Sequence, residues 1–169
     1  MNENSIYNTP VEIGARLLMI IVKNKIEIDF DKLLILDYLA LHANIINDNF
    51  KSLHPDNPFH GLEIYSKMNV SKNALKLLIS KGLIDVNFTS KGITYSTNPI
   101  GEYFLSFFEG DYYKELGMNI DNIINNFNDY DSDELQKYLF KNIDKWNGNS
   151  LSLNNKFSYN TYLNESLEE

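Results

Sequence analysis

The chain of 169 residues contains no cysteine, which excludes disulfides, thiolate zinc sites and cysteine nucleophiles. The sequence also lacks a stretch long enough to form a membrane-spanning helix. Its longest apolar run, residues 17–22, is six residues, whereas a spanning helix needs about 20. The first residues, "MNENSIYNTP", lack the basic start and the apolar run of a signal peptide. We therefore expect a cytoplasmic protein without a membrane partner.

Arginine is nearly absent too, since Arg16 is the one arginine beside fourteen lysines. The formal net charge of the chain is −8. A chain of that charge repels a nucleic-acid backbone as a whole, so any contact with a polyanion has to be local. Residues 62–98 are the local exception, because five lysines against two acidic residues give +3 and leave −11 for the remainder. The length fits one domain, which we place at 1–146, followed by a weakly ordered tail at 147–169.

Helix signals predict a mostly α fold. Thr9, Pro10 and Glu12 form a capping box with proline in the first turn, ahead of a helix over about 10–23. The C-terminal half of that helix is apolar on every side, which indicates burial between other elements. A second apolar helix is predicted over about 29–43, with an aspartate as its N-cap. These two helices are expected to form the platform of the domain.

The middle of the chain has the order of a winged helix. A short helix over 62–68, a turn at 69–70, and a second helix capped by Ser71 and stopped by Gly82 give a helix-turn-helix spacing. Alternating apolar and polar residues on both sides of 90–92 predict a two-stranded hairpin. The predicted fold class is mostly α with a small β-hairpin wing: a winged helix-turn-helix core with flanking N- and C-terminal helices.

The C-terminal third is predicted to be helical and to begin with a helix at 99–110. Two shorter helices follow at 111–117 and 118–128, and a capping box at Asp131 opens a last helix that ends near Trp146. Four aromatic residues of the first of these helices recur at helical spacing and are predicted to be core, namely Tyr103, Phe104, Phe107 and Phe108.

The stretch "SLHPDNPFHG" at 52–61 gathers several metal-ligating side chains. His54, Asp56 and His60 are candidate zinc ligands, and His42 is the one further imidazole of the sequence. A zinc site needs three or four ligands on a rigid scaffold, whereas the two prolines of this stretch bias the chain toward extended geometry. We interpret the stretch as a stiff loop, and we expect no metal and no cofactor.

The sequence contains no motif typical of an enzyme. A G-x-S-x-G elbow, a glycine-rich phosphate loop and an H-E-x-x-H pair are all absent. Acidic residues gather at 129–134, but this is a helix start, where capping is their ordinary use. We therefore predict that the protein is not an enzyme, and a small hydrolase built on the histidine loop is the catalytic alternative.

One helical face suits nucleic acid. On the helix after Ser71, the residues Lys72, Asn73 and Lys76 fall in one polar arc, and lysine and asparagine are types that contact phosphate and adenine. Lys91, at the predicted wing, adds a contact to the DNA backbone. A winged-helix DNA-binding transcriptional regulator, acting as a homodimer, is therefore the alternative function.

A resemblance adds what these patterns do not supply. The stretches "YNTPVEIGARLLMII", "LLILDYLALH", "SLHPDNPF" and the run from "ALKLLISKG" to "FFEGDYYKEL" resemble, in this order, the middle component of bacterial ABC-three-component systems. The resemblance covers about 7–139. It implies a small adaptor without catalytic residues, which couples an ABC ATPase of the SMC/Rad50-like kind to an effector encoded nearby, in an antiphage or conflict defence system.

The resemblance also implies which residues meet these partners. The positions carried over as partner-binding candidates are Tyr7, Asn8, Arg16, Ser52, His54, Pro55 and Pro58. Arg16 carries a further expectation from its surroundings: an unpaired charge on an apolar helix is costly, so the chain should supply a partner, either Asp37 or Glu12. The alternative is that this side chain reaches solvent past the apolar surface.

Overall fold

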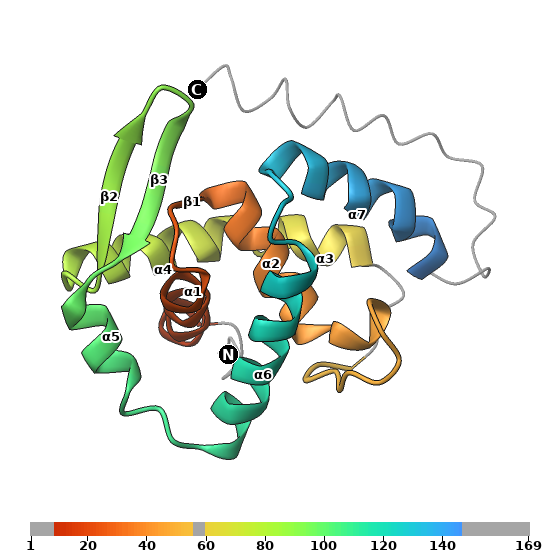
Figure 1. Ribbon diagram of the computed structural model, residues 1–169, viewed down its shortest axis with the longest axis horizontal. Coiled ribbons are helices and arrows are strands. Elements are labelled where there is room, and N and C mark those ends of the chain that lie inside the picture. Colours follow the sequence, from red (N-terminus) through yellow and green to blue (C-terminus); the bar gives the residue numbers. More distant parts are fainter. Residues whose placement is uncertain (1–8, 56–59, 147–169) are drawn as a thin grey trace, which may run out of the picture.

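The computed structural model describes residues 9–55 and 60–146 and confirms a mostly α fold with a small antiparallel sheet (Figure 1). The predicted tail at 147–169 lies outside the described residues. No helix of the described part is long and apolar enough to cross a bilayer. The elements are α1 (Pro10–Asn24), β1 (Ile28–Asp29), α2 (Phe30–Leu41), a short 3-10 helix (Ala43–Ile45), α3 (His60–Ser66), α4 (Met68–Ser80), β2 (Ile84–Thr89), β3 (Gly92–Thr97), α5 (Pro99–Leu105), α6 (Asp111–Asn126) and α7 (Ser132–Trp146).

Helix α1 forms where the sequence predicts it and lies at the centre of the molecule (Figure 1). The Oγ1 of Thr9 accepts the backbone N–H of Glu12 at 3.2 Å, and Pro10 occupies the first turn. Lys25 adopts a left-handed conformation with φ of 60° and ends the helix. Residues 13–21 are all buried, because α2, α4, α5 and α6 pack around the helix. The predicted burial on every side is thereby confirmed.

Helix α2 is the second half of the platform. Its N-cap is Asp29, whose carboxylate accepts the backbone N–H of Lys32 at 2.9 Å. The other carboxylate oxygen of Asp29 accepts the hydroxyl of Ser132 at the start of α7, so the cap also joins two distant helices. Residues 33–41 are buried against α1, α6 and α7. The two early helices therefore form the predicted platform.

Helices α3 and α4 are separated by a single residue. Lys67 stays in the right-handed helical region, with φ of −87° and ψ of −8°, and α4 begins at the next residue. The turn predicted at 69–70 is therefore wrong, and Ser71, predicted to be a cap, is buried inside α4. Met68 and Val70 pack against the core. Their burial favours an earlier helix start and outweighs the local capping signal.

The end of α4 follows the prediction. Gly82 has φ of 65°, which suits glycine, and its N–H donates to the carbonyl of Ile79 at 2.9 Å. The next N–H, of Leu83, reaches the carbonyl of Leu78 at 3.0 Å. This pair of bonds is a Schellman motif, which stops the helix and turns the chain into the wing.

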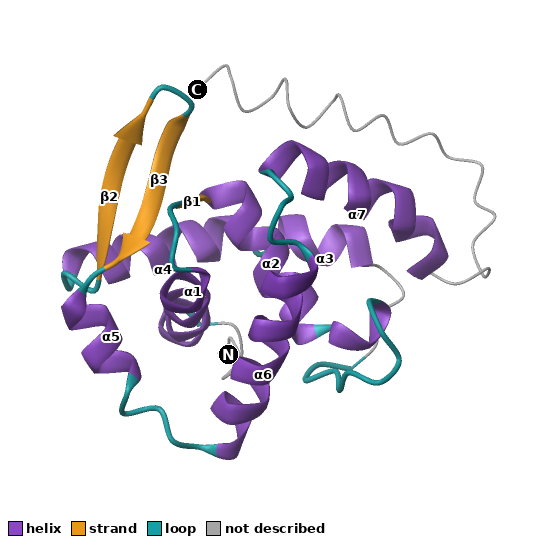
Figure 2. Cartoon of the chain, viewed as in Figure 1, coloured by secondary structure: helices purple, strands orange, loops and turns teal. Residues whose placement is uncertain are grey.

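The wing protrudes from the helical body as two strands (Figure 2). β2 and β3 pair antiparallel over their full length around the turn at 90–91, which confirms the predicted hairpin. A short strand that the sequence did not indicate, β1, extends the sheet by pairing Ile28 with Tyr95, so β3 is central. At the wing tip Phe88 is 83% exposed and lies opposite its cross-strand partner Ile93.

Helix α5 lies with its backbone directly against Leu83, in the turn between α4 and β2. Asn98 caps it, since its Oδ1 accepts the backbone N–H of Gly101 at 2.9 Å, and the helix begins at Pro99 as predicted. A Cβ on Gly101 would lie 2.1 Å from the carbonyl oxygen of Leu83, so this close approach requires glycine. The helix ends at Leu105 and is therefore shorter than the predicted helix at 99–110.

Helix α6 is a single helix of 16 residues, where the sequence predicts two. Gly117, the last residue of the first predicted helix, is buried in the middle of α6. A Cβ there would meet Cε of Lys23 at 3.3 Å and Sδ of Met19 at 3.7 Å, so the missing side chain lets α1 approach. This glycine serves packing between two helices and does not stop one.

Helix α7 opens with the predicted capping box. The backbone N–H of Asp131 donates to the carboxylate of Glu134, and the N–H of Glu134 donates to the carboxylate of Asp131, each at 2.9 Å. Leu135, Leu139 and Ile143 recur every four residues and are buried, where the helix contacts α2 and α3. Asp131 and Glu134 are therefore used as predicted, in capping.

Candidate functional site

The histidine loop, residues 51–55, is fixed against the C-terminal end of α2. The backbone N–H groups of Leu53 and His54 both donate to the carbonyl of Leu41, at 2.9 and 3.3 Å. These bonds give the loop a defined path across the helix end. This part of the chain is therefore an ordered loop, as the sequence predicts.

Asn119 of α6 joins the same loop to α2. Its buried amide Nδ2 donates to the carbonyl of Ala40 at 3.0 Å and to the carbonyl of Lys51 at 2.8 Å, so both of its hydrogens are used. Within the loop, the hydroxyl of Ser52 donates to Oδ1 of Asn44. One amide side chain thereby connects the loop, α2 and α6.

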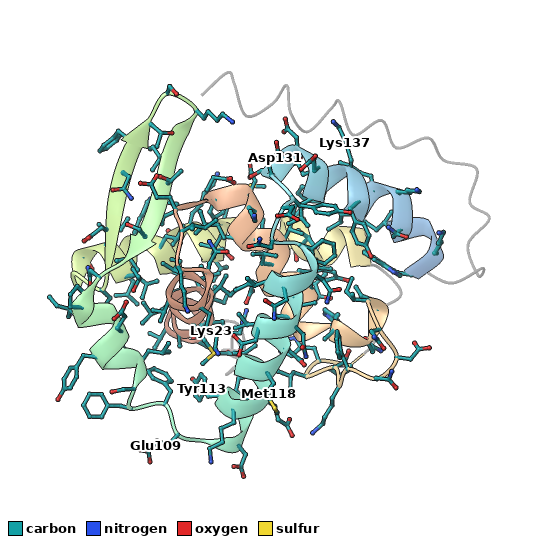
Figure 3. All side chains as sticks on the ribbon, viewed as in Figure 1. Lys23, Glu109, Tyr113, Met118, Asp131 and Lys137 are labelled. Atoms are coloured by element: carbon teal, nitrogen blue, oxygen red, sulfur yellow. The ribbon has the colours of Figure 1, made fainter. Side chains whose placement is uncertain are left out.

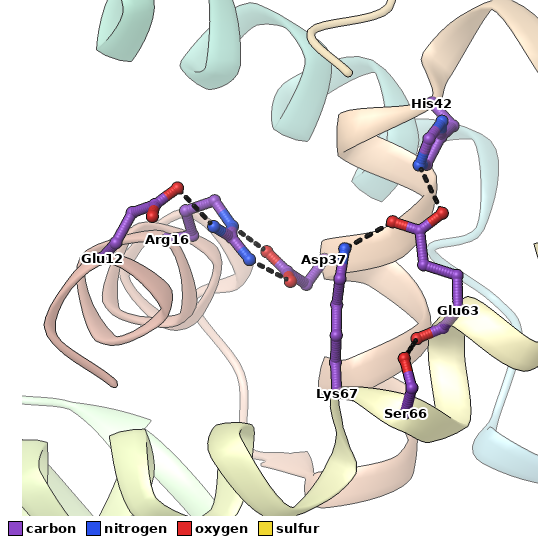
Figure 4. Close-up of polar contacts among 7 residues, drawn as sticks. All are labelled: Glu12, Arg16, Asp37, His42, Glu63, Ser66 and Lys67. Atoms are coloured by element: carbon purple, nitrogen blue, oxygen red, sulfur yellow. Dashed lines mark hydrogen bonds and ion pairs between the residues drawn. The ribbon is translucent and has the colours of Figure 1, made fainter. Parts of the chain in front are cut away.

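Two histidines and a glutamate converge where the loop, α2 and α3 meet. The ligand atoms of His42, His54 and Glu63 all lie within 4.8 Å of one another. His42 is fully buried, and its Nε2 lies 3.4 Å from Oε2 of Glu63. Nζ of Lys67 approaches the other oxygen, Oε1, at 2.5 Å, as Figure 4 shows. We call His42, His54 and Glu63 the histidine cluster.

The structure brings His42 and Glu63 to the side chain of His54, a grouping that the sequence did not indicate. The sequence offered Asp56 and His60 as the other candidate ligands. Asp56 lies outside the described residues, and His60 is the first residue of α3. Spacing alone could not find the cluster, because its members come from three segments. The one available signal is the apolar run "LALHA", which places a histidine at a buried helix end.

His54 is held toward its neutral form. Its burial lowers the pKa of the imidazole, and the charges of Lys67 and Arg16 and the neighbouring His42 lower it further, whereas Glu63 opposes them. The ring of His54 meets the ring of His42 edge-on, with centroids 5.9 Å apart. At neutral pH the His54 ring therefore keeps a nitrogen lone pair available.

Arg16 is buried beside this region, with 0% of its side chain exposed. Its Nε and Nη2 donate to the two carboxylate oxygens of Asp37 at 2.8 and 3.0 Å, and Nη1 donates to Glu12 at 3.1 Å (Figure 4). Burial alone would lower the pKa of Arg16, but the two carboxylates raise it above its ordinary value. Both predicted partners are confirmed, and the solvent-reaching alternative is wrong. Because the guanidinium is enclosed, Arg16 supports the fold and is not a surface contact for a partner.

The other partner-binding candidates stay predictions. Pro55 is exposed, and Ser52 is half-buried, as is His54. The remaining three, Tyr7, Asn8 and Pro58, lie outside the described residues.

The nucleic-acid candidates lie at the surface. Lys72, Asn73 and Lys76 are exposed on α4, and Lys91 is exposed in the turn of the wing. The ammonium of Lys72 lies 5.7 Å from the centroid of the Phe30 ring, within reach of a cation–π contact. Contact of these residues with DNA stays a prediction.

The aromatic residues predicted to be core lie largely on the surface, which corrects that prediction. Tyr103 is 68% exposed, Phe107 64% and Phe104 43%, and Ile100 on the same helical face is 60% exposed. Only Phe108 is half-buried. Their spacing marks an apolar face correctly, but no described element covers it. We call Ile100, Tyr103, Phe104 and Phe107 the α5 patch.

Beside the α5 patch lies an open groove of about 340 Å³ between α1 and the first half of α6. Figure 3 labels Lys23, Tyr113 and Met118, which line it, and shows side chains of α5 and the following loop projecting outward next to it. Phe108 borders the groove as well, and its ring meets that of Tyr113 with centroids 4.7 Å apart. Apolar surface thus extends from α5 onto α6.

A comparison with known families decides what kind of protein carries these surfaces. The model of the ABC-three component (ABC-3C) system Middle Component 2 family matches residues 6–149. The chain belongs to that family. No curated protein and no solved structure matches it. This Middle Component 2 protein is therefore a component of an ABC-3C system, and it has partner components in the same system.

Proposed function

We propose that this Middle Component 2 protein is a non-catalytic adaptor in the bacterial cytoplasm, which couples an SMC/Rad50-like ABC ATPase to an effector in antiphage or conflict defence. Family membership supports a role beside other components. The observation that carries the adaptor role is the α5 patch, four large apolar side chains on one exposed face. Contiguous exposed apolar surface of this kind marks protein interaction sites, whereas scattered single residues do not.

The α5 patch is suited to binding because its shape is set before a partner arrives. The rings of Tyr103 and Phe107 meet edge-on at 5.0 Å, and those of Phe104 and Phe108 at 5.5 Å. The close approach at Gly101 fixes the helix that carries Tyr103 and Phe104. Aromatic anchors on a rigid element lose little conformational entropy on binding, so more of the buried area contributes to affinity.

The proposal is tested by co-expressing this chain with the neighbouring ATPase and effector and isolating complexes through a tag on this chain. In the double variant Tyr103→Ser and Phe107→Ser, we expect one of the partners to be lost. Anchors of this type contribute about 2 kcal/mol each, so affinity should fall about 30-fold or more per residue. The matched control is Ile26→Ser, which removes an exposed apolar side chain from the turn after α1.

Three results would contradict the proposal. If the unaltered chain isolates neither partner, the adaptor role fails. If the double variant keeps both partners while its melting temperature is unchanged, the α5 patch is not the contact. If the chain alone binds duplex DNA with an affinity that falls steeply with salt, and Lys72→Glu with Lys76→Glu abolishes this binding, the regulator alternative is favoured instead.

A further inference from the structure

The histidine cluster has the composition of a metal site. Two imidazoles and one carboxylate come from three segments: the end of α2, the loop at 51–55, and α3. We propose that His42, His54 and Glu63 bind one divalent transition-metal ion of the zinc type. The proposal is independent of the adaptor role, because it concerns a site between elements of this chain alone.

The donor set matches what zinc takes in proteins. Zinc accepts imidazole nitrogen at about 2.0–2.1 Å and carboxylate oxygen at about 2.0–2.2 Å, and three protein ligands with a water complete a tetrahedral site. Two ligands of one ion are therefore at most about 4 Å apart. The ligand atoms here lie within 4.8 Å of one another, so a shift of about 1 Å in side chains would close the site.

The surroundings orient two of the three ligands. Oε2 of Glu63 points toward His42 at 3.4 Å, while Lys67 occupies the other oxygen, so one carboxylate oxygen is directed into the cluster. The backbone of His54 is fixed by its bond to the carbonyl of Leu41. Glu63 therefore already faces His42, although the ammonium that holds its other oxygen also places a positive charge beside the cluster.

The positive charge of Lys67 is the main factor that disfavours binding of a divalent ion. Its ammonium is bonded to the carboxylate that the ion would use, whereas the charge of Arg16 is already balanced by Asp37 and Glu12. Replacing Lys67 by methionine removes this charge at similar volume. The structure therefore predicts opposite effects for two neighbouring substitutions: Glu63→Gln weakens metal binding and Lys67→Met strengthens it.

An ion at this position would tie the loop to two helices. Binding to the folded state alone raises the temperature of unfolding, so Zn²⁺ should stabilise the chain by an amount that grows with the logarithm of its free concentration above Kd. This effect gives a readout that does not depend on any partner component.

The test is titration of the metal-free full chain with Zn²⁺ alone, followed by calorimetry and thermal unfolding, and with Co²⁺, followed by visible absorption. We expect one ion per chain and a tetrahedral Co²⁺ spectrum. His54→Gln and Glu63→Gln should each weaken Zn²⁺ binding at least about 100-fold, since even supporting residues behind the ligands cost about 10–100-fold. Glu109→Gln, at an exposed carboxylate in the loop after α5, is the matched control and should bind like the unaltered chain.

The two ligand variants are chosen so that they fold. His54 is half-buried, and Gln is isosteric with Glu63 and still accepts a bond from Lys67. Circular dichroism of the metal-free variants checks this. Failure of the unaltered chain to bind Zn²⁺ would overturn the proposal, and so would equal binding by His54→Gln, Glu63→Gln and Glu109→Gln. A loss of binding in Lys67→Met as large as that in Glu63→Gln would also overturn it, because an ammonium does not ligate a metal.

Discussion

The α1–α2 platform and the α5 patch are both built from large apolar side chains at helical spacing, yet one is closed and the other is open. Around α1, four helices cover every side, and even the charged Arg16 is enclosed and paired. On α5 the apolar face meets no described element. The difference shows that periodicity identifies an apolar face, whereas tertiary packing decides whether the chain itself covers it.

The largest expected effect is at the enclosed ion pair of the platform. Asp37→Ala leaves Arg16 buried with one of its two carboxylates, and unpaired buried charges cost about 3–5 kcal/mol of unfolding free energy. The matched control is Asp121→Ala, which removes the 2.7 Å pair with Lys23 at the surface and should cost about 1 kcal/mol or less. Urea unfolding of both variants measures the difference, and equal losses would show that burial does not set the strength of these pairs.

A smaller loss is expected where α5 meets the turn after α4. Gly101→Ala places a methyl group 2.1 Å from the carbonyl oxygen of Leu83, so the helix must shift, at about 1–3 kcal/mol. Gly14→Ala is the control, since its Cβ would meet Leu78 at 3.7 Å, an ordinary contact, and alanine favours the helix. Thermal unfolding compares the two. Similar stability of both variants would mean that α5 is not held as closely as described.

The smallest of the three effects is a pH dependence at the histidine cluster. The pKa of His54 is lowered in the folded chain, so between that pKa and the ordinary value of 6.5 the unfolded chain binds more protons. Stability from this group is therefore present above about pH 6.5 and is lost as pH falls toward the folded pKa. His54→Gln should reduce the slope of unfolding free energy between about pH 7.5 and about pH 5.5. An unchanged slope would show that His54 titrates as it does in the unfolded chain.

Local signals predicted the ends of most elements because their causes lie within a few residues. The cap at Thr9, the stop at Gly82 and the start at Asn98 each depend on bonds to neighbours three or four positions away. Where the prediction failed, distant groups were responsible. The predicted boundary between two helices at Gly117 does not exist, because this glycine lets Lys23 and Met19 of α1 approach an unbroken helix.

The two candidate sites were harder to predict from the sequence than the ends of the helices. The histidine cluster depends on the packing of the loop against two helices, which no spacing reveals. The α5 patch was visible as a pattern, but its exposure depends on what lies opposite. The two-residue strand β1 is too short to leave a pattern, and it forms because the edge of β3 is available to pair with it.

The unbroken course of α6 has a structural consequence. Its sixteen residues form a rod of roughly 24 Å. Near its start Tyr113 touches Phe108, which adjoins the α5 patch, and about 9 Å further along Asn119 holds the histidine loop. One continuous helix therefore carries both the contact to Phe108 and the anchor of the histidine loop.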